Sequence, residues 1–188
     1  MDDASFLLIR HAESTWNAAG RWQGHGDPPL SPQGREQALA LAGQLAGEHI
    51  EVLIASDLSR SVQTAEILGA RWGIVPRHDA RLREIDIGAW TGLTREQIEE
   101  RDAELLARFE AERLEARPGG GETRLEIRAR VRAAAAELAA AHRGRRVALV
   151  THLGVIRALV PGAETANAGW LRLAARVLQA QREREAGT

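Results

Sequence analysis

Histidines and arginines recur directly after three short apolar runs of the sequence. Arg10 and His11 follow the first run, and Arg60 lies a few residues beyond the second. His152 follows the third. Guanidinium groups match phosphate oxygens with paired hydrogen bonds, and a neutral imidazole is a competent nucleophile near pH 7. Brought to one place, these side chains would bind a phosphate group and attack it.

The apolar runs themselves, at 6–9, 52–55 and 147–151, predict buried strands. Continuous apolar runs of this length suit strands that are covered on both faces, as in a parallel sheet. The carboxyl ends of parallel strands meet at one edge of a sheet, and ligands bind beyond that edge. The sequence therefore predicts that its arginines and histidines converge there.

Helical patterns separate the predicted strands and carry readable start signals. Ser31 precedes a proline and predicts a helix over 33–46, whereas Thr94 and Thr123 each begin a capping box. The helix after Thr123 is expected to reach about His142, and 173–178 is expected to form a last edge strand before a polar end at 181–188. This alternation predicts an α/β fold, a three-layer α/β/α sandwich with a mostly parallel central sheet and a small helical cap insert.

The length of 188 residues predicts a single domain over 1–188, with a helical lid insert at about 94–118. We expect most arginines of the lid to pair with neighbouring glutamates. One of them is a candidate contact for a substrate carboxylate or a second phosphate. A 44% hydrophobic content is enough for one sizeable core.

Composition excludes several classes of function. Basic and acidic residues number 25 and 26, so no basic surface suited to nucleic acid is expected. The absence of cysteine excludes disulfides, thiolate metal sites and cysteine nucleophiles. No cluster of acidic residues has metal-ligand spacing, so we expect no metal and no other cofactor.

The sequence also predicts where the protein is found. No secretory signal is recognisable at the start of the sequence, and no apolar stretch approaches the roughly 20 residues of a membrane span. We expect a cytoplasmic protein without membrane contact. A homodimer is possible, and the sequence leaves the oligomeric state open.

An ordered set of motifs resembles the histidine phosphatase superfamily, the phosphoglycerate mutase-like proteins. The segment RHAESTWN at 10–17 resembles the family signature, with Ala12 where the family has glycine. Further matches follow in family order, at 23–24, 27–31, 34, 56–65, 82–92, 118–122 and 151–157. A single such tripeptide would occur by chance, but the ordered set over roughly 6–157 would not.

The resemblance implies a role for each matching residue. His11 is the nucleophile that becomes phosphorylated, and Glu84 gives a proton to the leaving oxygen and then activates water. The residues expected to hold the phosphoryl oxygens are Arg10, Asn17, Arg60 and His152, with His152 acting as a positive clamp if it is protonated.

Two neighbouring residues complete the predicted pocket. Gln23 and Gly24 are interpreted as loop residues that shape it, with Gly24 presenting a backbone N–H. For Asn17 the alternative is that it only caps a turn. His25 has little supporting context and is interpreted as a surface or packing residue.

The sequence favours hydrolysis of a small phosphorylated metabolite over phosphoryl transfer between two positions of a substrate. Mutases of the family carry Glu-Arg-x-Tyr-Gly at 84–88, whereas this chain has EIDIG and no tyrosine anywhere. A phosphoglycerate mutase and a non-catalytic phosphoryl-binding module are the two alternatives.

Overall fold

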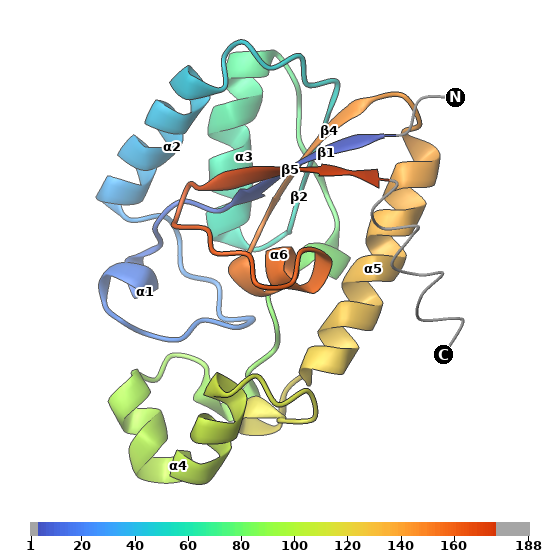
Figure 1. Ribbon diagram of the computed structural model, residues 1–188. Coiled ribbons are helices and arrows are strands. Elements are labelled where there is room, and N and C mark those ends of the chain that lie inside the picture. Colours follow the sequence, from blue (N-terminus) through green and yellow to red (C-terminus); the bar gives the residue numbers. More distant parts are fainter. Residues whose placement is uncertain (1–3, 176–188) are drawn as a thin grey trace, which may run out of the picture.

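A computed structural model describes residues 4–175, and in this part of the chain five strands form one sheet (Figure 1). Its order is β3-β2-β4-β1-β5. β1, β2, β3 and β4 run parallel, and β5 is antiparallel to β1. The strands are β1 (Ser5–Arg10), β2 (Val52–Ala55), β3 (Arg77–His78), β4 (Arg146–Thr151) and β5 (Trp170–Ala174).

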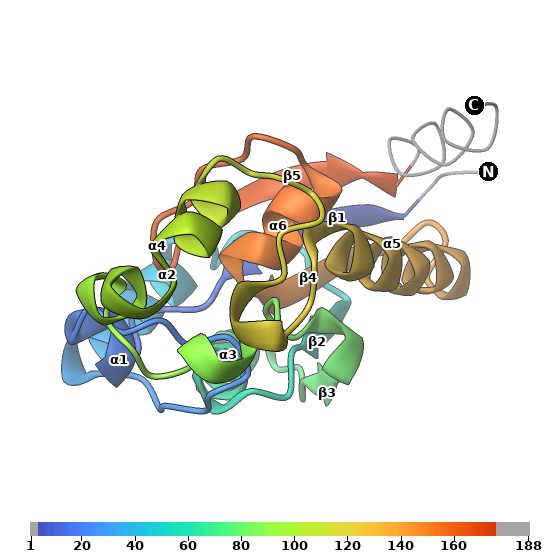
Figure 2. The same cartoon turned by 90° about the horizontal axis from the view of Figure 1, so that it is seen from below.

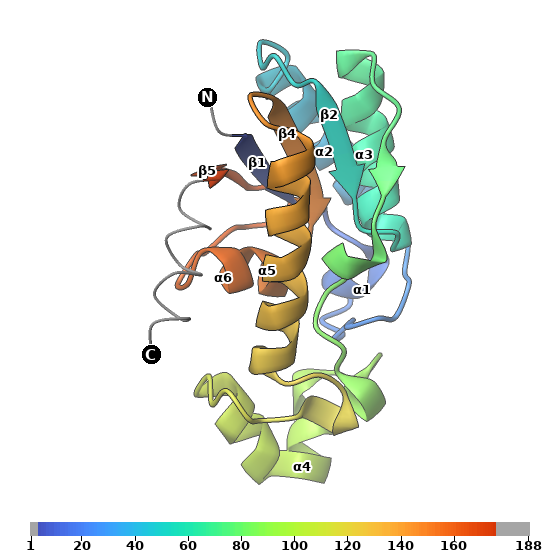
Figure 3. The same ribbon diagram turned by 90° about the vertical axis from the view of Figure 1, so that its right-hand side faces the viewer.

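Helices cover both faces of the sheet (Figure 3). Side chains alternate along β1, so that Leu7 and Ile9 join one core cluster and Phe6 and Leu8 join the other. The fully buried strands explain the uninterrupted apolar runs, and they confirm the predicted α/β fold with a mostly parallel sheet. One face carries α2 (Pro32–Gln44) and α3 (Ser59–Trp72), and the other carries α5 (Arg124–Ala141) and α6 (Leu153–Leu159).

The predicted helix starts are confirmed. The Ser31 hydroxyl accepts a hydrogen bond from the Gly34 N–H, and Thr94 and Thr123 form reciprocal capping boxes. The helix begins at Pro32, the proline expected at its first position, and ends at Gln44, two residues before the predicted end at Ala46. Shorter elements are α1 (Thr15–Ala18) and the 3-10 turns η1 (Ala80–Leu82), η2 (Gly88–Trp90) and η3 (Pro118–Gly120).

The last strand differs from its prediction. β5 spans Trp170–Ala174, three residues earlier than the predicted 173–178, and pairs Trp170 with Ile9. The charge of Arg172 interrupts the apolar pattern, but its side chain reaches Glu48 and solvent while the backbone continues the strand. Positions 176–178 of that prediction, and the polar end at 181–188, lie outside the described residues.

The segment at 94–118 forms α4 (Arg95–Glu110) beyond the carboxyl ends of the parallel strands (Figures 1 and 3). Seen from that end, α4 lies in front of the sheet (Figure 2). The helix is broken at Asp102, whose φ of −142° is not helical, and the Trp90 indole N–H donates to the Asp102 carboxylate at 2.7 Å. Trp90 also packs edge-on against Phe109 near the end of α4, so the segment is anchored at two points.

Candidate active site

The predicted residues meet in one cavity of about 360 Å³ at the carboxyl ends of the parallel strands. His152 lies behind the cavity, with its ring centroid 5.0 Å from that of His11. Three strand ends and their following loops thus supply one site, as the sheet topology predicted. The predicted residues that line the cavity are Arg10, His11, Asn17, Gln23, Gly24, Arg60 and Glu84.

His11 is held directly after β1 with one ring nitrogen free. Its backbone N–H donates to the Thr151 carbonyl, and its ring Nδ1 lies 2.7 Å from the carbonyl oxygen of Ala12. A carbonyl only accepts, so Nδ1 carries the proton of the neutral ring and Nε2 keeps its lone pair. Burial, followed by the charge of Arg60, holds the pKa of His11 well below its usual range. The ring is therefore neutral near pH 7.

His152 is also neutral, so it does not act as the positive clamp that a protonated ring would form. Burial, followed by the charge of Arg60, lowers its pKa well below the usual range. Its Nε2 lies 2.9 Å from the Ser56 hydroxyl, which itself accepts from the Leu58 N–H. Nε2 also lies 3.3 Å from the Ser61 hydroxyl, whereas the buried Nδ1 has no partner among residues 4–175. In the tautomer in which these hydroxyls donate to Nε2, Nδ1 carries the ring proton.

Arg60 is a buried cation and Arg10 a half-buried one, and both are held by backbone carbonyls. Arg10 donates to the Thr165 carbonyl at 2.7 Å. Arg60 donates to the carbonyls of Gly26 and Gly24 at 2.7 and 2.9 Å. Within residues 4–175 each bonds only to carbonyl oxygen, and each keeps a buried Nε without a partner.

This arrangement is electrostatically incomplete. Arg60 is 0% exposed, and burial lowers its pKa to about 10, so it stays charged at neutral pH. A buried charge is costly unless an opposite charge and hydrogen bonds offset its lost hydration. An anion in the cavity would supply both.

Ser14 organises the loop side of the cavity. The Asn17 amide oxygen accepts from the Ser14 N–H at 3.1 Å and caps α1, and Asn17 also lines the cavity. The Ser14 hydroxyl donates to the Gln23 amide oxygen at 2.7 Å. The Gly24 carbonyl accepts from Arg60, and the role of the Gly24 N–H toward a ligand stays a prediction.

The Glu84 carboxylate is fixed by two backbone donors. One oxygen accepts from the Ile85 N–H at 2.9 Å and the other from the Gly154 N–H at 3.2 Å. A side chain on Gly154 would collide with this carboxylate, so glycine is required there by the close approach. His25 was interpreted as a surface or packing residue, but its Nε2 contacts the Glu84 carbonyl at 2.9 Å. Its place beside Gly24 in the matching motif was the available signal.

Sequence reasoning missed the apolar wall of the cavity. Trp22 and Phe109 lie with ring centroids 5.8 Å apart and both line the cavity, which brings α4 to its rim. Apolar side chains carry no chemical signature in a sequence, and only the fold shows that these face the cavity. Ile85, Ile87 and Leu153 complete this wall.

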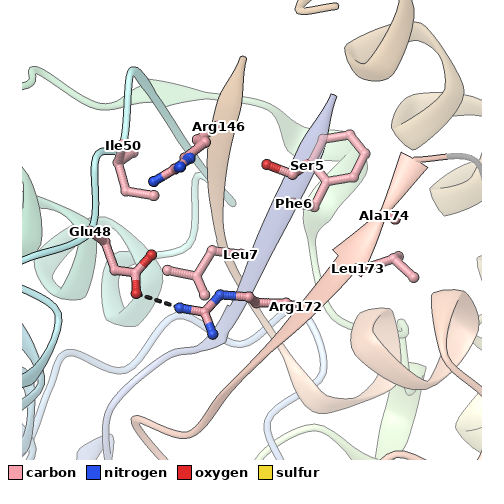
Figure 4. Close-up of a pocket in the computed structure, with 9 residues that line it drawn as sticks. All are labelled: Ser5, Phe6, Leu7, Glu48, Ile50, Arg146, Arg172, Leu173 and Ala174. Atoms are coloured by element: carbon pink, nitrogen blue, oxygen red, sulfur yellow. Dashed lines mark hydrogen bonds and ion pairs between the residues drawn. The ribbon is translucent and has the colours of Figure 1, made fainter. Parts of the chain in front are cut away.

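A larger cavity, of about 470 Å³, lies at the opposite end of the sheet beside Ser5 and Arg146 (Figure 4). It contains Arg172, whose guanidinium pairs with Glu48, and no histidine. Among residues 4–175, no group of three or more His, Asp or Glu side chains is placed to hold a metal ion. No helix of that same range is long and apolar enough to cross a membrane.

Comparison with known families identifies one match over most of the chain. The family model of the histidine phosphatase superfamily (branch 1) matches residues 6–176. This range contains every residue of the candidate site.

Individual relatives agree with that match. Glucosyl-3-phosphoglycerate phosphatase of Mycobacterium tuberculosis is 40% identical over 163 residues, covering 81% of this chain and 72% of the relative. Phosphoserine phosphatase 1 of Hydrogenobacter thermophilus is 38% identical over 154 residues, with the same coverage. The solved structure of a mycobacterial glucosyl-3-phosphoglycerate phosphatase with VO3 superposes with a TM-score of 0.83 at 36% identity, covering 90% of each chain.

Proposed function

The chain belongs to branch 1 of the histidine phosphatase superfamily, and we propose that it hydrolyses small phosphorylated metabolites through a phosphohistidine on His11. One observation carries the proposal. A buried, neutral imidazole shares a cavity with two guanidinium groups, the buried Arg60 and the half-buried Arg10, which bond only to backbone carbonyls within residues 4–175. That combination suits a nucleophile facing a phosphate.

In the first step, His11 Nε2 forms a bond to phosphorus while the bond from phosphorus to the ester oxygen breaks. Arg10 and Arg60 hold the equatorial oxygens and offset their developing charge. Glu84, protonated for this step, transfers its proton to the departing oxygen so that an alcohol leaves.

In the second step, the ionised Glu84 takes a proton from water. The water oxygen bonds to phosphorus, the nitrogen–phosphorus bond breaks, and inorganic phosphate forms while His11 recovers its neutral ring. His152 donates from its Nδ1 N–H to a phosphoryl oxygen in both steps. The guanidinium groups supply the positive charge that these steps require, so we propose that no metal is needed and that chelators leave activity intact.

We also propose that the whole chain works as one domain in which 94–118 is the cap of the catalytic cavity. Phe109 of α4 lines the cavity, and its packing against Trp22 and Trp90 supports this role. The cap would contact the part of the substrate beyond the ester oxygen. Phosphoserine and glucosyl-3-phosphoglycerate, after which the relatives are named, are the first substrates to test.

The test compares p-nitrophenyl phosphate hydrolysis by the native protein and by His11→Ala. We expect turnover to be abolished in the variant, and a native rate no higher than the variant's would support the non-catalytic binding module instead. Incubation with 3-phosphoglycerate separates the remaining alternative. If 2-phosphoglycerate appears faster than free phosphate, the protein is a mutase and the proposal of hydrolysis is wrong.

A further inference from the structure

A second, smaller cavity of about 50 Å³ lies beside the catalytic one and is lined by three arginines. Arg124 and Arg128 are four residues apart on α5, so they lie on the same face of the helix. Arg157 comes from α6. Arg95 of α4 pairs with Glu99 and Glu110, as was expected of most lid arginines.

The two cavities are lined by consecutive residues of the chain. Leu153 lines the catalytic cavity and Gly154 lines the second, and consecutive Cα atoms are about 3.8 Å apart. The Gly154 N–H bonds to Glu84, the residue assigned to the leaving oxygen. Glu84 therefore lines the catalytic cavity and is bonded to a residue that lines the second.

Arg124 connects the second cavity to the cap. Its guanidinium donates to the Phe109 carbonyl at 3.1 Å, and its central carbon lies 4.5 Å from the centroid of the Phe109 ring. Phe109 in turn lines the catalytic cavity. The Nε of Arg124 is buried and has no partner among residues 4–175, so it keeps a donor for a ligand.

The charge of the second cavity is positive overall. Three guanidinium groups face one carboxylate, that of the exposed Glu112. Arg157 donates to the Ala163 carbonyl at 3.1 Å, and its only recorded ion pair within residues 4–175 is a 4.0 Å contact with the exposed Glu164. The cavity therefore attracts an anion.

We propose that Arg124, Arg128 and Arg157 bind a carboxylate on the leaving group of the substrate. This inference rests on the proposed function, and it names a substrate class: phosphomonoesters whose alcohol carries a carboxylate a few bonds from the ester oxygen. Guanidinium forks match a carboxylate bidentately, which gives both affinity and orientation.

The test is a ratio of kcat/KM for two substrates that differ at one group. 3-Phosphoglycerate carries the carboxylate, and glycerol 3-phosphate carries a hydroxymethyl group in its place. We expect the native protein to prefer 3-phosphoglycerate, and Arg128→Gln to reduce the ratio by roughly ten- to a hundredfold, mainly through KM. Arg143→Gln, an exposed arginine beyond the far end of α5, is the matched control and should leave the ratio unchanged.

A second variant is expected to change the kcat/KM ratio in the opposite direction. Glu112→Gln removes the one negative charge of the cavity, so the ratio should rise. Partial loss of folding would lower kcat/KM for both substrates together. It would not change the ratio of the two kcat/KM values in opposite directions in Arg128→Gln and Glu112→Gln. An unchanged ratio in Arg128→Gln, or a native ratio near one, overturns the carboxylate site while the phosphatase proposal stands. A native protein that hydrolyses neither these esters nor p-nitrophenyl phosphate overturns the proposed function itself.

Discussion

Two cavities at opposite ends of the sheet both contain arginine, and they differ in how its charge is offset. At the amino ends of β1 and β4, Arg172 is 64% exposed and pairs with Glu48 (Figure 4). At the carboxyl ends, Arg60 is fully buried and bonds only to backbone carbonyls within residues 4–175. The charge of Arg172 is offset by a carboxylate of the protein itself. The charge of Arg60 has no paired carboxylate among residues 4–175, and a bound anion would offset it.

The comparison teaches that size is a poor guide to function in this molecule. The cavity near Arg172 is the larger of the two, at about 470 against 360 Å³, yet it contains no imidazole and no buried cation. Surface ion pairs contribute little free energy, whereas an uncompensated buried charge is costly and persists only with a reason. Unpaired buried charge, joined to a nucleophile, identifies the site.

The largest expected effect tests the difference between the two arginines directly. Arg60→Gln removes a buried cation from the phosphate position, and kcat/KM for p-nitrophenyl phosphate should fall by roughly 10³- to 10⁵-fold, as for other arginines that stabilise phosphoryl transfer. Arg172→Gln is the matched control and should change kcat/KM less than about twofold. Equal losses in the two variants would contradict the distinction between the ends of the sheet.

A smaller effect is expected from Glu84→Gln, and it depends on the leaving group. Alkyl alcohols leave poorly without a proton, so hydrolysis of an alkyl phosphate should fall by about 10²- to 10⁴-fold. p-Nitrophenolate needs little protonation, so its release should be affected much less in the first step. Steady-state kinetics on both esters provide the measurement, and equal losses would count against Glu84 as the acid.

The third effect concerns stability at low pH and involves the two buried histidines of the catalytic end. His11 and His152 have pKa values well below the usual 6.5, whereas in the unfolded chain they take up protons below about pH 6.5. The unfolded state then binds more protons, so stability decreases as pH falls from 6.5 towards the folded pKa values. Each histidine contributes a slope of up to about 1.4 kcal/mol per pH unit.

Urea denaturation at pH 7 and pH 5 measures this slope, and His11→Gln should remove about half of the part due to the two histidines. The cavity near Arg172 contains no histidine, so variants there should leave the slope unchanged. A slope that is the same in native protein and His11→Gln would show that His11 titrates normally.

The smallest effect tests the other end of the comparison. Arg172→Gln breaks an ion pair in which the arginine is 64% and the glutamate 23% exposed. Pairs of this kind contribute about 0.2 to 1 kcal/mol, so the free energy of unfolding should decrease by no more than that. Denaturant titration of the native protein and the variant at low and high salt provides the check. A loss above about 2 kcal/mol would show that this pair is structurally essential.

Much of the fold could be predicted from local sequence. The apolar runs at 6–9, 52–55 and 147–151 coincide with β1, β2 and β4, because a strand buried on both faces needs apolar residues at every position. Helix starts were predictable because Ser31, Thr94 and Thr123 act through their own side chains on the next turn. Parallel topology then placed the residues of the site at one edge.

The remaining features depend on contacts between distant segments. The start of β5 was misplaced because a charged Arg172 is compatible with an edge strand whose side chain reaches solvent. Phe109 gave no local signal, because its contact with Trp22 exists only in the folded chain. The arginines of the second cavity come from two helices, and their convergence likewise requires the fold.

The unpaired guanidinium of Arg60 also bears on how the catalytic cycle ends. Inorganic phosphate, the product, carries the same oxygens as the ester and satisfies the same donors. A cavity that binds the phosphate group of its substrate through these positive donors also binds the phosphate product through them. We therefore expect turnover to be governed in part by the departure of phosphate, and accumulated phosphate to slow the protein as a competitor.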